Sequence, residues 1–167
     1  MTRKTRTGLL WRSFARFVSI PWISRSAIYI ATRIDRPLMR MSAGRIRLSF
    51  IVPMLLLRCR GALSGAIREV PLLFVVDEDG LLLVGSRGGG EKEPAWCSNL
   101  RAHPGVECLL QGRVQCYQAE ELSGARRDSA WDLAVAAYPG YGFYQRRITR
   151  VIPVFSLSPV PGEMARK

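Results

Sequence analysis

The chain has 167 residues, 48% of them apolar, and carries a formal net charge of +12. This length suits one domain, and this apolar content excludes an intrinsically disordered protein. The charge is uneven, because residues 1–68 hold 14 cations and one acid (net +13) whereas residues 69–167 hold 11 cations and 12 acids (net −1). The N-terminal part therefore predicts an anionic partner, either a membrane surface or a nucleic acid.

Residues 1–44 are predicted to form basic amphipathic helices that precede the main domain. Residues 8–20 place apolar side chains at helical spacing, flanked by arginines, and Pro21 ends this pattern. Arginines interrupt every apolar run before it reaches the length of about 20 residues that a membrane-spanning helix needs. We expect these helices either to pack on the domain's own core or to dock, through residues 1–40, on an anionic membrane surface. Tryptophans among the arginines favour lipid, so a nucleic-acid partner is not expected.

Residues 45–160 are predicted to form a β-rich domain, which leaves residues 161–167 as a tail. Residues 106–119 predict either a hairpin or one long strand with a kink. The last apolar run contains Pro153, which indicates a sheet edge or a bulge. Further strands are predicted over residues 47–60, 68–77, 81–85 and 148–157, and helices from Pro94 to His103 and over residues 120–137. This order predicts a mainly β (α+β) fold, an antiparallel barrel or open roll.

The most informative stretch is a glycine-rich turn between a strand and a helix. Residues 83–96 read LVGSRGGGEKEPAW, with three consecutive glycines before Pro94. Glycines adopt positive φ without steric cost and let backbone N–H groups approach a ligand closely. A helix start that follows such a turn favours an anionic group. The pattern predicts an anion-binding turn, although most glycine runs are simple surface turns.

The four cysteines do not have the spacing of a metal site. Neither a CxxC pair nor a partner for the single histidine, His103, is present in the sequence, so no metal site is expected. Most of the cysteines lie in apolar runs, where free thiols are small hydrophobes, and this favours a reducing, cytoplasmic compartment. Cys97 lies in the first turn of a predicted helix, a position that can lower a thiol pKa, but nothing marks it and His103 as a nucleophile and base.

The order of motifs across roughly residues 45–158 resembles the deazaflavin-dependent nitroreductase family of actinobacteria. These proteins have a split antiparallel β-barrel of the flavin-reductase type and bind reduced coenzyme F420, an 8-hydroxy-5-deazaflavin. The residues that carry the resemblance are Arg68 with Pro71-Leu72, Ser86-Arg87-Gly88-Gly89, Pro94, Trp96, Asn99-Leu100, His103-Pro104, Val106, Tyr138-Pro139, Tyr141, Tyr144 and Ile152-Pro153-Val154.

The resemblance implies a coenzyme site made of cations, backbone donors and an apolar slot for a flat ring. Reduced F420 carries a phosphate and a glutamate tail, which arginines can bind by charge-assisted hydrogen bonds. Flavin mononucleotide, accepted by related barrels, is the alternative cofactor. Trp96 is expected either to form a wall of the ring site or only to plug the barrel. The implied cofactor-binding residues are Arg60, Ser64, Arg68, Ser86, Arg87, Gly88, Gly89, Pro94 and Trp96.

One turn departs from the family pattern. Family members usually carry Gly-Arg-Lys-Ser/Thr-Gly before the second strand, whereas this chain has Gly-Ala-Leu-Ser-Gly at residues 61–65. Both cations of the turn are missing, although Arg58 and Arg60 lie just before it. The loss of two charge-assisted contacts, at roughly 1 to 3 kcal/mol each, is expected to weaken coenzyme binding.

The resemblance implies hydride transfer from reduced F420 to an electron-poor acceptor, which is a quinone, an enone or a nitroaromatic. Tyr141 and Tyr144 are the candidate catalytic residues, since a phenol can donate a proton or hydrogen bond to the acceptor oxygen. These rings otherwise only shape an apolar pocket. We expect a cytoplasmic oxidoreductase, peripheral at the inner face of the cell membrane. The alternative is a non-catalytic module on the same barrel that binds a membrane surface, a quinone or a cofactor.

Overall fold

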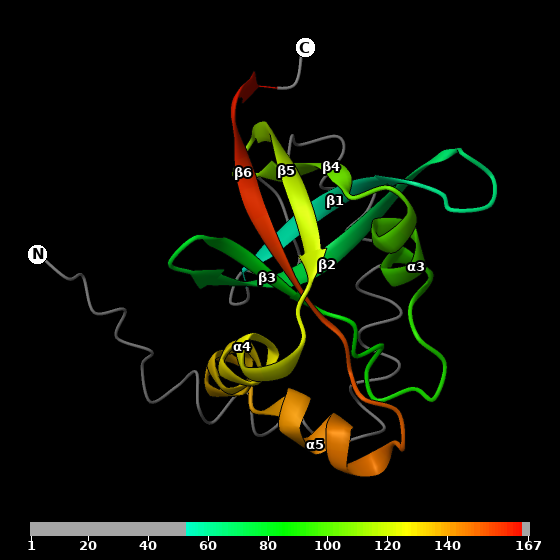
Figure 1. The fold of residues 1–167 in the computed structure, drawn as a ribbon, viewed down its shortest axis with the longest axis vertical. Helices are drawn as coiled ribbons and strands as arrows, with labels where there is room; N and C mark the ends of the chain where they lie inside the picture. Colours follow the sequence, from blue (N-terminus) through cyan, green and yellow to red (C-terminus); the bar gives the residue numbers. More distant parts are fainter. Residues whose placement is uncertain (1–52, 165–167) are drawn as a thin grey trace, which may run out of the picture.

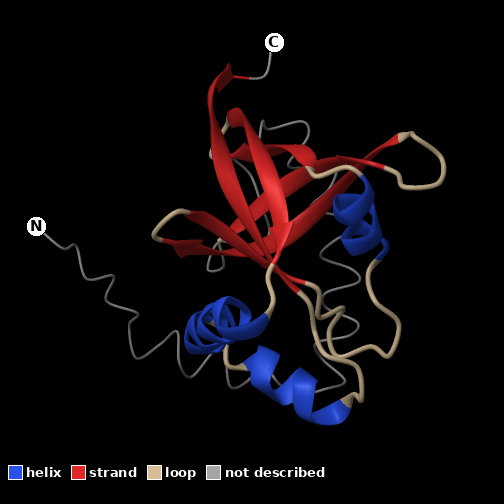
Figure 2. Ribbon diagram, in the orientation of Figure 1, coloured by secondary structure: helices blue, strands red, loops and turns tan. Residues whose placement is uncertain are grey.

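Antiparallel strands close into a barrel in the order β1-β2-β3-β6-β5-β4 (Figure 1). The computed structural model describes residues 53–164. Within them the strands are β1 (Met54–Arg60), β2 (Ile67–Asp77), β3 (Gly80–Val84), β4 (Gly105–Leu110), β5 (Arg113–Glu121) and β6 (Val154–Met164). The helices are α3 (Ala95–Ala102), between β3 and β4, and α4 (Gly124–Ala137) and α5 (Gly140–Arg147), both between β5 and β6. Figure 2 shows α4 and α5 together beneath one end of the barrel.

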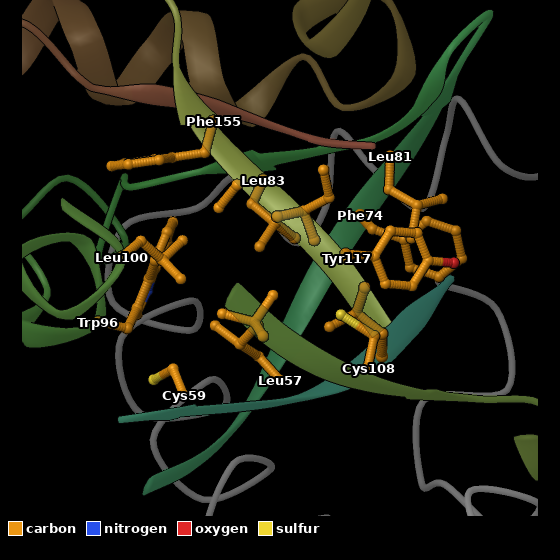
Figure 3. Close-up of a cluster of buried hydrophobic side chains, with 14 of the residues drawn as sticks. Leu57, Cys59, Phe74, Leu81, Leu83, Trp96, Leu100, Cys108, Tyr117 and Phe155 are labelled. Atoms are coloured by element: carbon orange, nitrogen blue, oxygen red, sulfur yellow. The ribbon is translucent and has the colours of Figure 1, made fainter. Parts of the chain in front are cut away.

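The barrel encloses a core of aliphatic and aromatic side chains. Alternation along β1 sends Leu55, Leu57 and Cys59 into this core, because successive strand residues point to opposite faces. Trp96 of α3 packs on Phe155 of β6 with ring centroids 5.5 Å apart. Figure 3 shows the two rings at one end of the core and Tyr117 at the other. The core therefore holds α3 against the wall of the barrel.

A second apolar cluster lies between the end of β3 and helices α4 and α5. It contains Val84, Ala134, Tyr138, Tyr141, Tyr144, Ile148 and Ile152. Because Val84 is the last residue of β3, this cluster places the tyrosines next to the glycine-rich turn that follows that strand.

The structure confirms the antiparallel barrel and resolves one open alternative. Residues 106–119 belong to a hairpin, since β4 and β5 pair from Gly105↔Gln118 to Leu110↔Arg113. The turn between them has positive φ at Gln111 (51°) and Gly112 (82°). The two-residue turn therefore reverses the chain, and a single kinked strand is excluded.

Three expected boundaries were wrong. The helix expected from residue 120 begins at Gly124, because Glu120 and Glu121 extend β5 and pair with β6. The last strand starts after Pro153 and not at residue 148, and it continues to Met164. Helix α5 was not expected. The predicted N-terminal helices and the first residues of the strand over 47–60 lie outside the described residues.

Candidate functional site

The glycine-rich turn adopts a run of left-handed residues. Arg87, Gly88 and Gly89 have φ values of 49°, 62° and 77°. Gly89 N–H donates to the Ser86 carbonyl (3.0 Å) and Gly90 N–H to the Arg87 carbonyl (3.3 Å). Within residues 53–164 the N–H groups of Arg87 and Gly88 have no hydrogen-bond partner. Successive backbone N–H groups in such a turn form a concave site for an anion.

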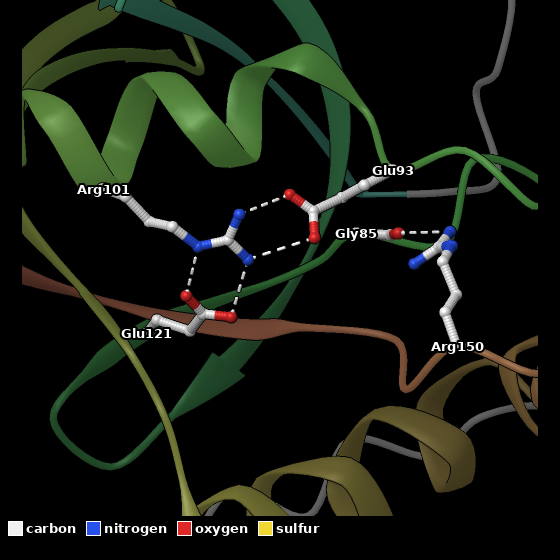
Figure 4. A network of polar contacts seen from close by, with 5 residues as sticks. All are labelled: Gly85, Glu93, Arg101, Glu121 and Arg150. Carbon is white, nitrogen blue, oxygen red and sulfur yellow. Dashed lines mark hydrogen bonds and ion pairs between the residues drawn. The ribbon is translucent and has the colours of Figure 1, made fainter.

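Arg150 binds the carbonyl groups of this turn through its guanidinium. Its Nη2 donates to the carbonyls of Gly85 (3.1 Å), Ser86 (3.2 Å) and Gly90 (3.1 Å), and its Nε also reaches Gly90 (3.2 Å). Figure 4 shows the guanidinium of Arg150 at Gly85. Nη1 of Arg150 is buried and has no hydrogen-bond partner within the described part of the chain. Arg150 was not predicted as a site residue, because no local motif marks it.

The tyrosines lie against the same turn. A Cβ atom added to Gly89 would lie 3.2 Å from Cδ1 of Tyr144, so the ring contacts the glycine backbone directly. The Tyr144 hydroxyl hydrogen-bonds that of Tyr138 over 3.2 Å. Tyr141 packs edge-on against Tyr138, with centroids 5.0 Å apart. Tyr138 also belongs to this cluster, although it was not predicted as a site residue. Its three-residue spacing from Tyr141 could have indicated its place beside that tyrosine.

Burial keeps the phenols of Tyr138 and Tyr141 protonated. Burial, together with the hydrogen bond that pairs it with Tyr144, raises the pKa of Tyr138. Burial and the nearby Tyr144 hydroxyl raise the pKa of Tyr141. Tyr141 and Tyr144 are each only 3% exposed. Tyr138 and Tyr141 therefore offer neutral hydroxyl groups that do not ionise near neutral pH.

Helix α3 joins the glycine-rich turn through its first residues. Pro94 is the N-cap residue of α3, with φ −63°. A Cβ atom on Gly85 would lie 2.8 Å from Sγ of Cys97, so only glycine fits where β3 passes the helix. Trp96 is 5% exposed and packs within the barrel core. Burial, with a smaller contribution from Glu93, raises the pKa of Cys97, which rules out the activated thiolate considered for this position.

The other end of α3 holds the turn between β1 and β2. Asn99, 9% exposed, accepts a hydrogen bond from Ala62 N–H (2.9 Å) and donates one to Sγ of Cys59 (3.6 Å). Three expected coenzyme-binding residues lie around this turn and are exposed: Arg60, Ser64 and Arg68. The hydrogen bond from Ala62 N–H to Asn99 joins their turn to α3. The glycine-rich turn, in contrast, lies against the tyrosines through Gly89 and Tyr144.

An ion-pair network fixes the segment that precedes α3. Arg101 binds Glu93 through both carboxylate oxygens (2.5 and 3.0 Å) and Glu121 likewise (2.5 and 2.8 Å). Figure 4 shows the guanidinium between the two carboxylates. The hydrogen bonds from Arg101 lower the pKa of Glu121. The network therefore ties the loop after the glycine-rich turn to α3 and to the end of β5.

Two surface grooves lie elsewhere on the barrel. A groove of about 550 Å³ is lined by Arg58, Arg60 and Glu107 among others, and a groove of about 390 Å³ lies between α4, β6 and the β2–β3 turn. Neither of these two grooves includes Ser86–Gly89 or the tyrosines. No helix within residues 53–164 is long and apolar enough to cross a bilayer, and no cluster of metal-ligating side chains occurs in that range.

Comparison with known proteins identifies the family. The model of the F420H(2)-dependent quinone reductase family matches residues 31–159. The chain belongs to this family. An F420H(2)-dependent quinone reductase of Mycobacterium tuberculosis strain H37Rv is 31% identical over 142 residues, 82% of this chain and 95% of the relative.

Two solved structures support the same assignment. An F420-H2 dependent reductase, FDR-A, is 42% identical with a TM-score of 0.58, over 64% of this chain and 94% of its own. A second structure, described as a domain-swapped dimer, is 36% identical with a TM-score of 0.61, over 80% of this chain and 99% of its own. The expected class, an F420H2-dependent oxidoreductase with coenzyme F420, and the expected barrel are confirmed.

The glycine-rich turn of this F420H2-dependent reductase fits the charged part of the coenzyme. The N–H groups of Arg87 and Gly88, which have no partner within residues 53–164, and the exposed Arg87 side chain could donate to an anionic group. The turn could hold the anionic part of F420, with the phenols beside it.

Proposed function

We propose that this protein reduces a quinone to a quinol at the site formed by the glycine-rich turn and the tyrosine cluster. Reduced F420 supplies a hydride from C5 of its deazaflavin ring. The acceptor takes this hydride and one proton, so two electrons and two hydrogens convert quinone to quinol. The contact between Gly89 and the ring of Tyr144 carries the proposal, because it joins a phosphate-binding turn to a hydroxyl donor.

The chain's own residues have two tasks in this reaction. Arg87 and the N–H groups of the turn bind the anionic part of the coenzyme, and the tyrosine cluster excludes water from the reacting groups. The hydrogen bond between Tyr138 and Tyr144 uses one of their two hydroxyl hydrogens. The other has no acceptor among the described residues, so it can donate to the quinone oxygen as negative charge develops on that oxygen. Tyr141, packed on Tyr138, shares this role or shapes the pocket.

Titration and turnover test the proposal directly. Quenching of deazaflavin fluorescence gives the dissociation constant for F420, and flavin mononucleotide is titrated in parallel. Oxidation of reduced F420 is then followed with a water-soluble quinone, an enone and a nitroaromatic. We expect F420 to bind more tightly than flavin mononucleotide and the quinone to be reduced fastest. Absence of F420 binding at concentrations well above cellular ones would refute the proposal.

We also propose that the protein docks on an anionic membrane surface. The β1–β2 turn supports this proposal, because Leu63 at its tip is fully exposed and Ile67 is 61% exposed. Exposed Arg60 and Arg68 flank these apolar side chains. Apolar residues bordered by arginines suit the boundary between headgroups and acyl chains. The basic residues 1–40, which lie outside the described part, carry charge of the same sign.

Sedimentation with vesicles tests membrane docking. We expect the full chain to bind vesicles of phosphatidylglycerol and not vesicles of phosphatidylcholine, and high salt should release it. Leu63→Asp should weaken this binding. Val76→Asp, at another exposed apolar position (68%), is the matched control and should leave binding unchanged. Equal binding of both vesicle types would contradict the proposal.

A further inference from the structure

We propose that Arg150 is a positioning residue for the coenzyme, which acts by orienting the glycine-rich turn. The turn is defined here as residues 85–90, and Arg150 binds the carbonyls of three of its six residues. The identity of the ligand rests on the function proposed above. The role of Arg150 in shaping the turn rests on the hydrogen bonds alone.

Peptide geometry explains how Arg150 directs a donor toward the ligand. The Ser86 carbonyl and the Arg87 N–H belong to one peptide unit, and in a trans peptide these two groups point in opposite directions. Because Arg150 holds the Ser86 carbonyl at 3.2 Å, the Arg87 N–H points away from Arg150. The hydrogen bond from Gly90 N–H to the Arg87 carbonyl orients the next unit, which contains the Gly88 N–H. Contacts to the carbonyls of Ser86 and Arg87 therefore orient the N–H groups of Arg87 and Gly88. These two N–H groups have no partner within residues 53–164.

Arg150 also places a positive charge behind the turn. Its partners in the described residues are neutral carbonyls, and none of the ion pairs formed within residues 53–164 includes it. A part-buried guanidinium without a carboxylate partner is costly unless a negative group comes near. Nη1 of Arg150 is buried and has no hydrogen-bond partner in the same range, so a nearby negative charge would stabilise this guanidinium. The charge favours an anion at the Arg87 and Gly88 N–H groups.

The backbone of Arg150 is itself fixed by helix α5. Nε2 of Gln145 donates to the Arg150 carbonyl (2.8 Å), and Oε1 of Gln145 accepts from Ile152 N–H (2.8 Å). Both ends of one side-chain amide thus hold the segment on either side of residue 151. Tyr144, next to Gln145 in the helix, contacts Gly89. Helix α5 therefore supports the turn twice, through a ring and through Arg150.

The test compares charge and geometry in two variants. Arg150→Met removes both, and Arg150→Lys keeps the charge but cannot bind three carbonyls with one rigid fork. The dissociation constant for F420 is measured by fluorescence, and amide hydrogen exchange is measured in ligand-free protein. We expect Arg150→Met to weaken F420 binding about 10- to 100-fold and to speed exchange at Gly89 and Gly90. The KM for the quinone should stay within about twofold, because the acceptor contacts other residues.

Arg127→Met is the matched control. Arg127 is also a part-buried arginine that donates to a carbonyl, that of Ile152 (3.2 Å), and has a buried Nε without a partner in the described residues. It lies on α4, and none of its hydrogen bonds or ion pairs within residues 53–164 reaches residues 85–90, so its loss should lower stability without changing F420 affinity. If Arg150→Met does not fold, Arg150→Lys and Gln145→Met, which releases the backbone of Arg150, give the same comparison.

The possible outcomes separate the two proposals. Unchanged F420 affinity and unchanged exchange at Gly89 and Gly90 in the Arg150 variants would overturn the positioning role while wild-type binding stands. Absence of F420 binding by the wild-type protein would overturn the proposed function. In that case the exchange rates of ligand-free protein still decide whether Arg150 shapes the turn.

Discussion

The ring of Tyr144 lies directly on the backbone of Gly89, close enough that an added Cβ atom would be 3.2 Å from Cδ1 of the ring. Tyr144 comes from α5 and Gly89 from the turn after β3, and the two residues are 55 positions apart in the chain. A helix that follows the barrel's fifth strand thus forms one wall of the proposed coenzyme turn.

Gly89→Ala should therefore disturb both stability and binding. The residue has φ +77°, which costs an L-residue about 1–2 kcal/mol, and its new methyl group would press on Tyr144. We expect lower stability in urea and weaker F420 binding by fluorescence. Gly124→Ala is the control, because Gly124 has φ +54° with open space around it. An equal effect of both variants on F420 affinity would show that the Tyr144 contact does not matter.

Arg87→Ala should weaken F420 binding while stability hardly changes. The side chain is exposed, and its proposed role is a charge-assisted contact with the ligand. Loss of such a contact corresponds to about a 10- to 100-fold rise in the dissociation constant. Arg113→Ala, at an exposed position in the β4–β5 hairpin, should leave the affinity unchanged. Unchanged affinity in Arg87→Ala would remove the role assigned to that side chain.

Tyr144→Phe should lower turnover and leave F420 affinity nearly unchanged. The variant keeps the ring on Gly89 and removes the hydroxyl that pairs with Tyr138. Loss of a general acid costs on the order of 100-fold or more in kcat. Tyr141→Phe, measured in parallel, distinguishes a proton donor from a pocket residue. Tyr117→Phe, at the other end of the core, is the control; a similar fall in its kcat would argue against a specific role for Tyr144.

Alkaline pH should destabilise the fold through its buried thiols. Burial raises the pKa of Cys108 to about 12 and also raises the pKa of Cys59. An unfolded thiol has a pKa of about 8.5, so above that pH the unfolded chain loses protons that the folded chain keeps. The free energy of unfolding should then fall by about 1.4 kcal/mol per pH unit for each such thiol. The share of Cys108 should extend to about pH 12.

Urea titrations between pH 8 and pH 11 check this prediction. Cys108→Ala should be less stable at neutral pH, because it leaves a cavity, but its stability should decline less steeply with pH. A slope equal to that of the wild-type protein would contradict the assignment of the decline to this thiol.

Local chemistry explains which parts of the site could be predicted. The glycine-rich turn is visible in the sequence because three neighbouring positions, Arg87 to Gly89, need left-handed backbone and two of them are glycine. The β4–β5 hairpin was only one of two predicted alternatives, because the residue with positive φ in its turn, Gln111, is not a glycine. Such a conformation is uncommon outside glycine, so the sequence did not decide between turn and kink.

Long-range contacts explain what was missed. Arg150 acts on residues about 60 positions earlier, and in the sequence it resembles any surface cation. The full length of β6 was not predicted, because Pro159 disfavours a strand. In the structure Pro159 pairs with Tyr117, and the strand continues to Met164. Helix α5 was not predicted, because its aromatic residues have weak helix propensity. Packing against α4 and β3 stabilises these residues in the structure.

Because β6 lies between β3 and β5, the barrel cannot close during synthesis until β6 has left the ribosome. Until the segment from Val154 to Met164 has been synthesised, two strand edges stay open and can pair with another nascent chain. Arg150, four residues upstream of that strand, emerges at nearly the same moment. The barrel therefore closes, and Arg150 becomes available to the glycine-rich turn, only after the other described strands have been synthesised.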